Sequence, residues 1–175
     1  MLDTCRLAIH RGFSIVELMI GITILAILLG VALPSFQVWL QNAQIRNAAE
    51  AIQNGLQRAR AEAVARNVNI EFVLGTGSSW VVRTAGGAII DSRSSSEGSA
   101  NVTQTVTPSG ATTVTFNSFG ALGANSDGSA PLAQVELDSA VLPPANSQEL
   151  RVTVGVGGNI RMCDPNAPSS SPRAC

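Results

Sequence analysis

The feature that most constrains this chain is an apolar run near its N-terminus, Phe13–Leu33, which has 21 residues and a single charge, Glu17. A helix rises about 1.5 Å per residue, so about 20 such residues cross the hydrocarbon core of a bilayer. Arg6 and Arg11 precede the run, and arginines favour the cytoplasmic side of a membrane. The run therefore predicts one membrane-spanning helix whose N-terminal end faces the cytoplasm.

A secretory signal that is removed after the run is the alternative interpretation. Its cleavage site would follow the apolar stretch as a small-x-small pattern. Here residues 34–67 continue with apolar side chains at helical spacing and polar side chains between them, which predicts an amphipathic helix with one face free for a sheet. Pro34 stands at the junction, where we expect a kink or a break, whereas Gly55 weakens the helix without ending it. We therefore interpret the run as a retained anchor.

Glu17 is unusual because a carboxylate inside an apolar run costs roughly 2.5–3.5 kcal/mol on insertion scales. Such a residue commonly has a partner or a function. The alternative is that Glu17 lies close to the membrane interface and is solvated there.

The segment Arg11–Leu18, RGFSIVEL, resembles the type III signal of type IV prepilins and type II secretion pseudopilins. The resemblance implies that a prepilin peptidase cuts after Gly12 on the cytoplasmic side and methylates Phe13, the new N-terminus. Glu17 is then the fifth mature residue, which in this family neutralises the N-terminal amine of a neighbouring subunit during assembly. Physical reasoning agrees, because a buried carboxylate and a buried ammonium each lose hydration unless they meet.

After Asn67 the pattern changes to short alternating segments separated by Gly, Ser and Pro turns. The candidate strands are residues 68–74, 80–84, 88–91, 101–106, 112–116, 134–137, 149–154 and 159–162. One long helix followed by several strands predicts an α+β fold, in which a long N-terminal transmembrane and amphipathic helix packs on a C-terminal antiparallel β-sheet domain. We expect Phe116 and Phe119 to pack and Gly120 to turn the chain.

Three further segments, residues 56–67, 115–120 and 157–175, resemble the GspH/FimT branch of pilin-like proteins. The resulting division is a leader peptide over residues 1–12, a transmembrane half-helix over 13–33 and an amphipathic half-helix over 34–67. A β-rich GspH/FimT-like domain with a C-terminal disulfide loop then occupies residues 68–175.

Cys163 and Cys175 lie close together in a Pro/Ser-rich tail without metal-ligating companions. This spacing favours a disulfide over a zinc site, which needs four N or S ligands, and a disulfide indicates an oxidising compartment. Cleavage after Gly12 would also remove the third cysteine, Cys5. The ending resembles FimT/FimU-type minor pilins, in which a last strand bearing arginines runs into a disulfide-closed loop.

Some FimT-like proteins bind DNA during natural transformation through a Gly-Arg-x-Arg pattern before this first cysteine. The present chain has GNIR over residues 158–161, so the second arginine is present as Arg161 and the first is replaced by Asn159. Arg173 and Arg151 could join Arg161 in a small DNA-binding patch. The alternative is that Arg161 pairs with Asp164 or with a carbonyl and stabilises the loop.

Composition argues against an enzyme. The chain has one histidine, His10 in the predicted leader, no tyrosine, and neither a G-x-S-x-G elbow nor the lysine of a phosphate-binding loop. A net charge of −1 excludes the class of broadly basic proteins that coat nucleic acids. The prediction names no catalytic residue, no metal site and no cofactor.

The leading hypothesis is a minor type IV pilin, a filament subunit that acts in pilus assembly or priming, with the tip as one position. Its expected partners are other major and minor pilins, the prepilin peptidase, the inner membrane and the pilus assembly machinery. The expected location is a single pass through the inner membrane with the C-terminal domain in the periplasm, and the extracellular pilus after assembly. The alternatives are a DNA-binding minor pilin in natural transformation and a minor pseudopilin of type II secretion.

Overall fold

The computed structural model describes residues 13–175, so the predicted leader with Gly12 at its end lies outside the described residues. The described chain forms one helix, α1 (Ile15–Arg66), followed by nine strands. The strands are β1 (Ile70–Leu74), β2 (Trp80–Thr84), β3 (Ile89–Arg93), β4 (Val102–Thr107), β5 (Thr113–Phe116), β6 (Leu122–Gly123), β7 (Gln134–Ser139), β8 (Leu150–Val154) and β9 (Ile160–Cys163). The chain divides into two compact units, one up to Gln37 and one over Val38–Cys175.

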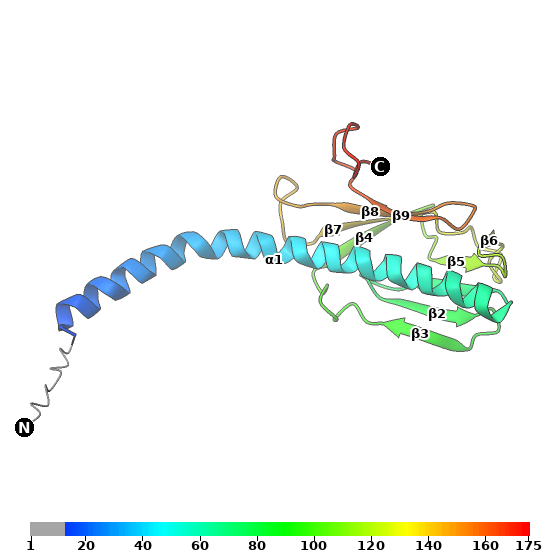
Figure 1. The fold of residues 1–175 in the computed structure, drawn as a ribbon, viewed down its shortest axis with the longest axis horizontal. Coiled ribbons are helices and arrows are strands. Elements are labelled where there is room, and N and C mark those ends of the chain that lie inside the picture. The colour runs from blue at the N-terminus through cyan, green and yellow to red at the C-terminus, as the bar shows by residue number, and fades with distance from the viewer. Residues whose placement is uncertain (1–12) are drawn as a thin grey trace, which may run out of the picture. The chain divides into compact units, whose positions relative to one another are not determined.

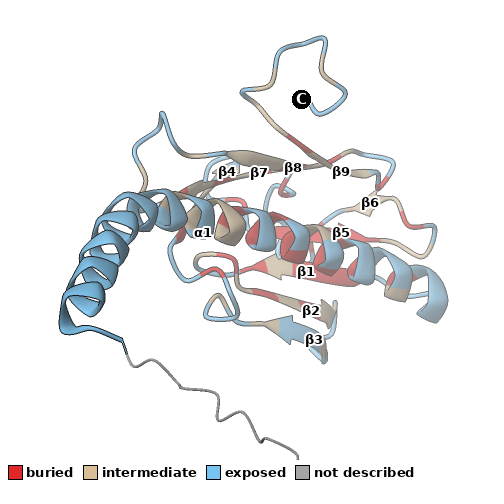
Figure 2. Ribbon diagram, turned by 60° about the vertical axis from the view of Figure 1, so that its left-hand side comes forward, coloured by how far each residue is buried: buried red, intermediate tan, exposed pale blue. Residues whose placement is uncertain are grey.

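The described part of the N-terminal unit is mainly helix, and its apolar side chains are not covered by protein. Ser14 caps the helix, since the Glu17 backbone N–H donates to its hydroxyl at 3.3 Å. Large apolar side chains from Phe13 to Phe36 are at least half exposed, and this part of α1 is pale blue throughout in Figure 2. By length and composition this stretch can cross a membrane, with a mean hydropathy of 2.6 over its most apolar window. α1 is continuous through Pro34, so this residue does not end the helix.

The C-terminal unit contains two antiparallel sheets (Figure 1). A five-stranded sheet has the order β3-β2-β1-β5-β6, and a four-stranded sheet has the order β4-β7-β8-β9. The predicted α+β fold is confirmed, but its strands form two sheets where one was expected. The reason is that β4 pairs with β7, whereas β5 returns to pair with β1. Alternation along one strand predicts its faces but not its distant partner.

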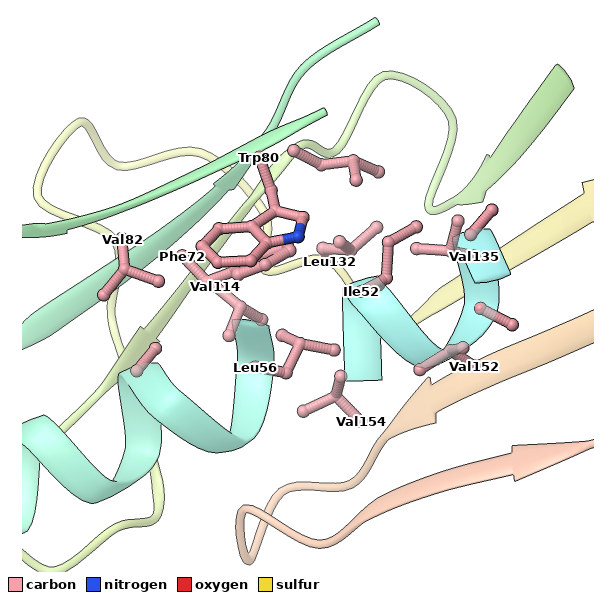
Figure 3. Packing of buried hydrophobic residues seen from close by; sticks show 14 of the residues in the cluster. Ile52, Leu56, Phe72, Trp80, Val82, Val114, Leu132, Val135, Val152 and Val154 are labelled. Atoms are coloured by element: carbon pink, nitrogen blue, oxygen red, sulfur yellow. The ribbon is translucent and has the colours of Figure 1, made fainter. Parts of the chain in front are cut away.

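The core lies where the second half of α1 meets both sheets (Figure 3). Helix residues that are fully buried recur every three or four positions, namely Ile45, Ala48, Ala49, Ile52, Leu56, Ala59 and Ala63. They pack with Phe72, Val82 and Val114 of the first sheet and with Val135, Leu137 and Val152 of the second. Every buried hydrophobic residue between positions 13 and 175 lies within 45–163. The fragment Val38–Cys175 therefore carries the whole core.

Two turn residues explain where the helix stops and where one core prediction fails. Asn67, directly after α1, has a φ of 54°, the left-handed conformation that commonly terminates helices. Phe116 is fully buried as expected, but Phe119 is 89% exposed, so the prediction that it packs is wrong. The Asn117 side-chain oxygen accepts from the backbone N–H groups of Phe119 and Ala121 and holds Phe119 in the turn between β5 and β6. Gly120, with a φ of 74°, completes that turn.

Candidate functional site

The first candidate site is the start of α1, where Phe13 and Glu17 lie among exposed apolar side chains. These two residues share one shallow face with Leu18, Gly21, Ile22 and Leu25. Within residues 13–175 the Glu17 carboxylate forms neither a hydrogen bond nor an ion pair. The bond between Glu17 and the Ser14 hydroxyl comes from the Glu17 backbone N–H. A carboxylate that is surrounded by apolar side chains is well placed to receive a cation from another molecule.

The second candidate site is the C-terminal loop. β9 delivers Cys163, which is 4% exposed, to a disulfide with Cys175. The loop is held by more than the disulfide, since the Asp164 N–H donates to the Arg173 carbonyl at 2.7 Å. The Arg161 guanidinium donates to the Ala174 carbonyl at 2.6 Å. These contacts fix a Pro/Ser-rich segment that would otherwise lack the apolar residues to order itself.

The three arginines of the predicted DNA patch are not brought together. Arg151 on β8 and Arg161 on β9 line one hollow beside the C-terminal loop. Arg151 forms an ion pair with Glu136 on β7, and Arg161 binds the Ala174 carbonyl. Arg173 lines a different cleft. The structure therefore places two of the three side chains side by side, and both already have partners.

A buried ionic network lies on the first sheet. Glu71 on β1 is 1% exposed and accepts from Arg83 Nε on β2 at 2.9 Å. Glu71 also accepts from the Ser126 N–H at 3.3 Å and from the Ser126 hydroxyl, which fastens the loop after β6 to the sheet. In that loop the Ser129 side chain and backbone N–H lower the pKa of Asp127, and the charge of Arg83 adds to the effect.

Three charged residues near the C-terminal end of α1 form ion pairs with one another. Arg66 Nε donates to the Glu62 carboxylate at 2.6 Å, and Arg58 approaches it at 3.0 Å. The hydrogen bond from Arg66 lowers the pKa of Glu62, and the charges of Arg66 and Arg58 act in the same direction. This arrangement is a mixed-charge helix face, in which oppositely charged side chains four positions apart stabilise the helix. In the part of the chain that the structure describes, no group of three His, Cys, Asp or Glu side chains is arranged to hold a metal ion.

Two protein-family models match this chain. The model of the family described as type II transport protein GspH matches residues 48–158, more than half of the chain. The chain belongs to the GspH family. A second model, the prokaryotic N-terminal methylation motif, matches residues 8–33 of this GspH-family protein. No curated protein sequence matches the chain.

The fold of the GspH-family protein is similar to that of the type IV minor pilin FimU of Pseudomonas aeruginosa strain PAO1. The crystal structure of FimU in space group P21 aligns with a TM-score of 0.52 and 20% identity, over 75% of this chain and 94% of that chain. The crystal form in space group P65 gives a TM-score of 0.49 and 19% identity, over 74% of this chain and 98% of that chain. At this level of identity the similarity establishes the fold.

These findings confirm the predicted family and its minor pilin or pseudopilin character. Proteins of the pilin family are structural subunits, and membership implies contacts with other pilins and with assembly machinery. Processing by a prepilin peptidase fits the methylation motif, and the motif together with the apolar helix fits a membrane-anchored pilin.

Sequence reasoning missed a cleft in the C-terminal unit of the GspH-family protein, which we call the tail cleft. It is lined by Asn42, Arg46, Gln148, Leu150, Met162, Cys163, Asp164 and Arg173. The cleft brings residues of α1 next to the C-terminal tail, more than 100 positions away in sequence. Arg46 reads from the sequence as one polar position on an amphipathic helix, and no local signal connects it with Arg173.

Proposed function

We propose that this GspH-family protein is a minor type IV pilin, a filament subunit that acts in pilus assembly or priming. Phe13–Leu33 would cross the inner membrane, with the C-terminal domain in the periplasm before assembly and in the extracellular pilus afterwards. The observation that carries the proposal is the exposed apolar start of α1 with the unpaired Glu17 carboxylate inside it. Such a surface is stable only in lipid or against other apolar helices. The inner membrane would supply the lipid before assembly, and the neighbouring pilins would supply the helices in the filament.

Processing would create the partner of Glu17. A prepilin peptidase would cut between Gly12 and Phe13 and methylate the amine of Phe13. The resulting cation at the start of one subunit meets the Glu17 carboxylate of a neighbour, which lowers the desolvation cost of both groups. The methylation motif over residues 8–33 supports this step. Residues 1–12 then form the leader, 13–33 the membrane half of the helix, 34–67 its amphipathic half and 68–175 the β-rich domain.

The experiment that tests the proposal measures recovery of the full-length protein in sheared filaments. We expect the mature protein to begin with N-methylated Phe13, as measured by mass spectrometry of the N-terminal peptide. Glu17→Ala should leave membrane insertion and cleavage intact but reduce recovery in filaments at least tenfold. Glu50→Ala is the matched control, because Glu50 is an exposed acid on the same helix outside the apolar segment. Normal recovery of Glu17→Ala in sheared filaments would show that Glu17 has no role in assembly.

Membership of type II secretion is the alternative that the description of the family model brings forward. Deletion of the gene separates the two systems. Loss of surface pili with normal protein secretion supports the type IV proposal, and loss of secretion with normal pili supports a minor pseudopilin.

DNA binding during uptake is the second candidate function. Its supporting observation is the hollow that Arg151 and Arg161 share beside the C-terminal loop, which also presents the polar residues Ser169 and Ser171. Two arginines can contact phosphates, and such contacts bind weakly and depend strongly on salt. The partners that these arginines already have, Glu136 and the Ala174 carbonyl, favour the filament proposal over this one.

A further inference from the structure

The tail cleft combines an apolar floor with two unpaired cations. Leu150 at the start of β8 and Met162 on β9 supply the apolar side chains. Arg46 of α1 and Arg173 of the C-terminal loop also line the cleft. Within the described chain, neither guanidinium forms an ion pair or a hydrogen bond, which sets them apart from Arg58, Arg66, Arg83 and Arg151. Two unpaired arginines in the lining of one cleft are suited to an anion, because a guanidinium forms strong charge-assisted hydrogen bonds with carboxylates and phosphates.

The walls of the cleft are fixed before any ligand arrives. Asn42 Nδ2 donates to the Asn146 carbonyl at 2.9 Å, and Asn42 Oδ1 accepts from the Gln148 N–H at 2.9 Å. These bonds fasten the segment before β8 to α1. On the other side, the Cys163–Cys175 disulfide and the bond from the Asp164 N–H to the Arg173 carbonyl hold the loop that carries Arg173. A site with fixed walls loses little entropy when it binds.

The charge of the cleft is positive despite one acid in its lining. The Asp164 carboxylate accepts from the Asn166 N–H at 2.9 Å and is thereby directed into its own turn. Two arginines against this single, already bonded carboxylate leave a net positive cleft on a chain whose formal charge is −1. The lining of the cleft therefore attracts an anion.

The size of the cleft limits what can enter. Its volume is about 140 Å³, below the range of about 300–1,000 Å³ that pockets for whole small molecules occupy. A cleft of this size suits one side chain of a partner protein better than a whole small molecule. Glutamate fits both halves of the cleft, because its methylene stem can lie on Leu150 and Met162 while its carboxylate meets the arginines.

We propose that the tail cleft is a docking site for a glutamate side chain of a neighbouring subunit in the filament. The proposal rests on the proposed function for the identity of the neighbour. A continuous polyanion such as DNA fits less well, because a nucleotide is larger than the cleft.

The test uses the full-length protein in detergent micelles, labelled with ¹³C in the methionine methyl groups. The sequence has three methionines, so Met162 in the cleft and Met19 in the apolar helix give separate signals. The probe is the peptide N-acetyl-Ala-Glu-Ala-amide, with N-acetyl-Ala-Gln-Ala-amide as its uncharged match. We expect the glutamate peptide alone to shift the Met162 signal to saturation, with the Met19 signal unchanged.

Three variants locate the binding energy. Arg46→Gln and Arg173→Gln should each weaken the glutamate peptide at least tenfold, because each removes one of two cations. Arg58→Gln is the matched control, since Arg58 is an exposed arginine on the same helix that pairs with Glu62 outside the cleft. We expect it to leave the affinity unchanged.

Three outcomes would overturn the proposal. A Met162 signal that does not respond to the glutamate peptide, or responds equally to both peptides, excludes a carboxylate site. A stronger response to inorganic phosphate or to a 12-nucleotide single strand makes the cleft a phosphate site. Failure here is separate from failure of the proposed function, which is measured by recovery of Glu17→Ala in filaments. If the glutamate peptide binds but the protein never reaches filaments, the tail cleft is a glutamate site, and the proposal that the glutamate belongs to a neighbouring filament subunit is wrong.

Discussion

Gly55 on α1 lies directly against the indole of Trp80 on β2, so close that a Cβ at position 55 would stand 2.8 Å from Trp80 Cε2 (Figure 3 shows the surrounding packing). The same Cβ would stand 2.8 Å from Cε2 of Phe72, whose ring centroid is 6.0 Å from that of Trp80. A glycine that looks like a weak point in the helix pattern is therefore what allows α1 to approach the first sheet.

Replacing Gly55 tests this close packing. Gly55→Ala adds a methyl group to a filled core, which typically costs about 1–3 kcal/mol, and the better helix propensity of alanine returns at most about 1 kcal/mol. We expect a net loss of up to about 2 kcal/mol in the free energy of unfolding, measured by urea denaturation of the fragment Val38–Cys175. Gly157→Ala is the control, because a Cβ there meets nothing within 4 Å. Equal stability of Gly55→Ala and the parent fragment would show that the rings move aside freely.

The Glu71–Arg83 pair should be costly to break from one side. Arg83→Met leaves the buried Glu71 carboxylate without its cation, and we expect a loss of about 1–3 kcal/mol by urea denaturation of the same fragment. The double variant Glu71→Gln/Arg83→Met should lose less than Arg83→Met alone, because no uncompensated charge stays buried and the glutamine side chain keeps an oxygen that can accept from Ser126. Arg66→Met breaks the surface pair with Glu62 and should cost much less than Arg83→Met. If Arg83→Met behaves like Arg66→Met, the buried pair has no special role.

Removal of the disulfide should release the C-terminal loop. The closed loop spans a sequence separation of 12, and the chain-entropy model assigns about 3 kcal/mol to a loop of this length. For the double variant Cys163→Ser/Cys175→Ser we expect a loss of stability of that order. Trypsin should also cut after Arg173 faster, as followed by intact mass after reduction. The substitution Ser169→Ala in the same loop is the control for a change that leaves the bond in place, and protease resistance equal to that of the parent would mean that the other loop contacts suffice.

Sequence reasoning succeeds where the signal is local and stops where it depends on distant contacts. The long apolar helix and the strand over residues 80–84 follow from hydropathy and alternation within a few neighbouring positions, and the described chain has both elements. The short strand β6, at Leu122–Gly123, has too few residues to alternate. The separation of β4 from β5 into two sheets depends on pairings with β7 and β1, which lie tens of residues away.

The candidate sites follow the same division. The segment around Phe13 and Glu17 is contiguous, so its motif can be read directly from the sequence. The tail cleft could not be, because Arg46 and Arg173 are joined only by the packing of α1 against β8, β9 and the loop. The partners of Arg151 and Arg161 could not be predicted from the sequence either. Glu136 belongs to a neighbouring strand, and the Ala174 carbonyl belongs to the closed loop.

DNA binding gives the last prediction, measured with the fragment Val38–Cys175 titrated with duplex DNA at about 50 and 200 mM salt. Arg151 is ion-paired with Glu136 and Arg161 is bound to a carbonyl. We therefore expect that Arg161→Ala does not change the affinity of the fragment for DNA. The same substitution should instead loosen the loop and speed trypsin cleavage after Arg173, because it removes the bond to the Ala174 carbonyl. Two free arginines would give a slope of log affinity against log salt of about −2. A slope of that size that disappears in Arg161→Ala would contradict the expectation and make uptake of DNA the better account of this loop.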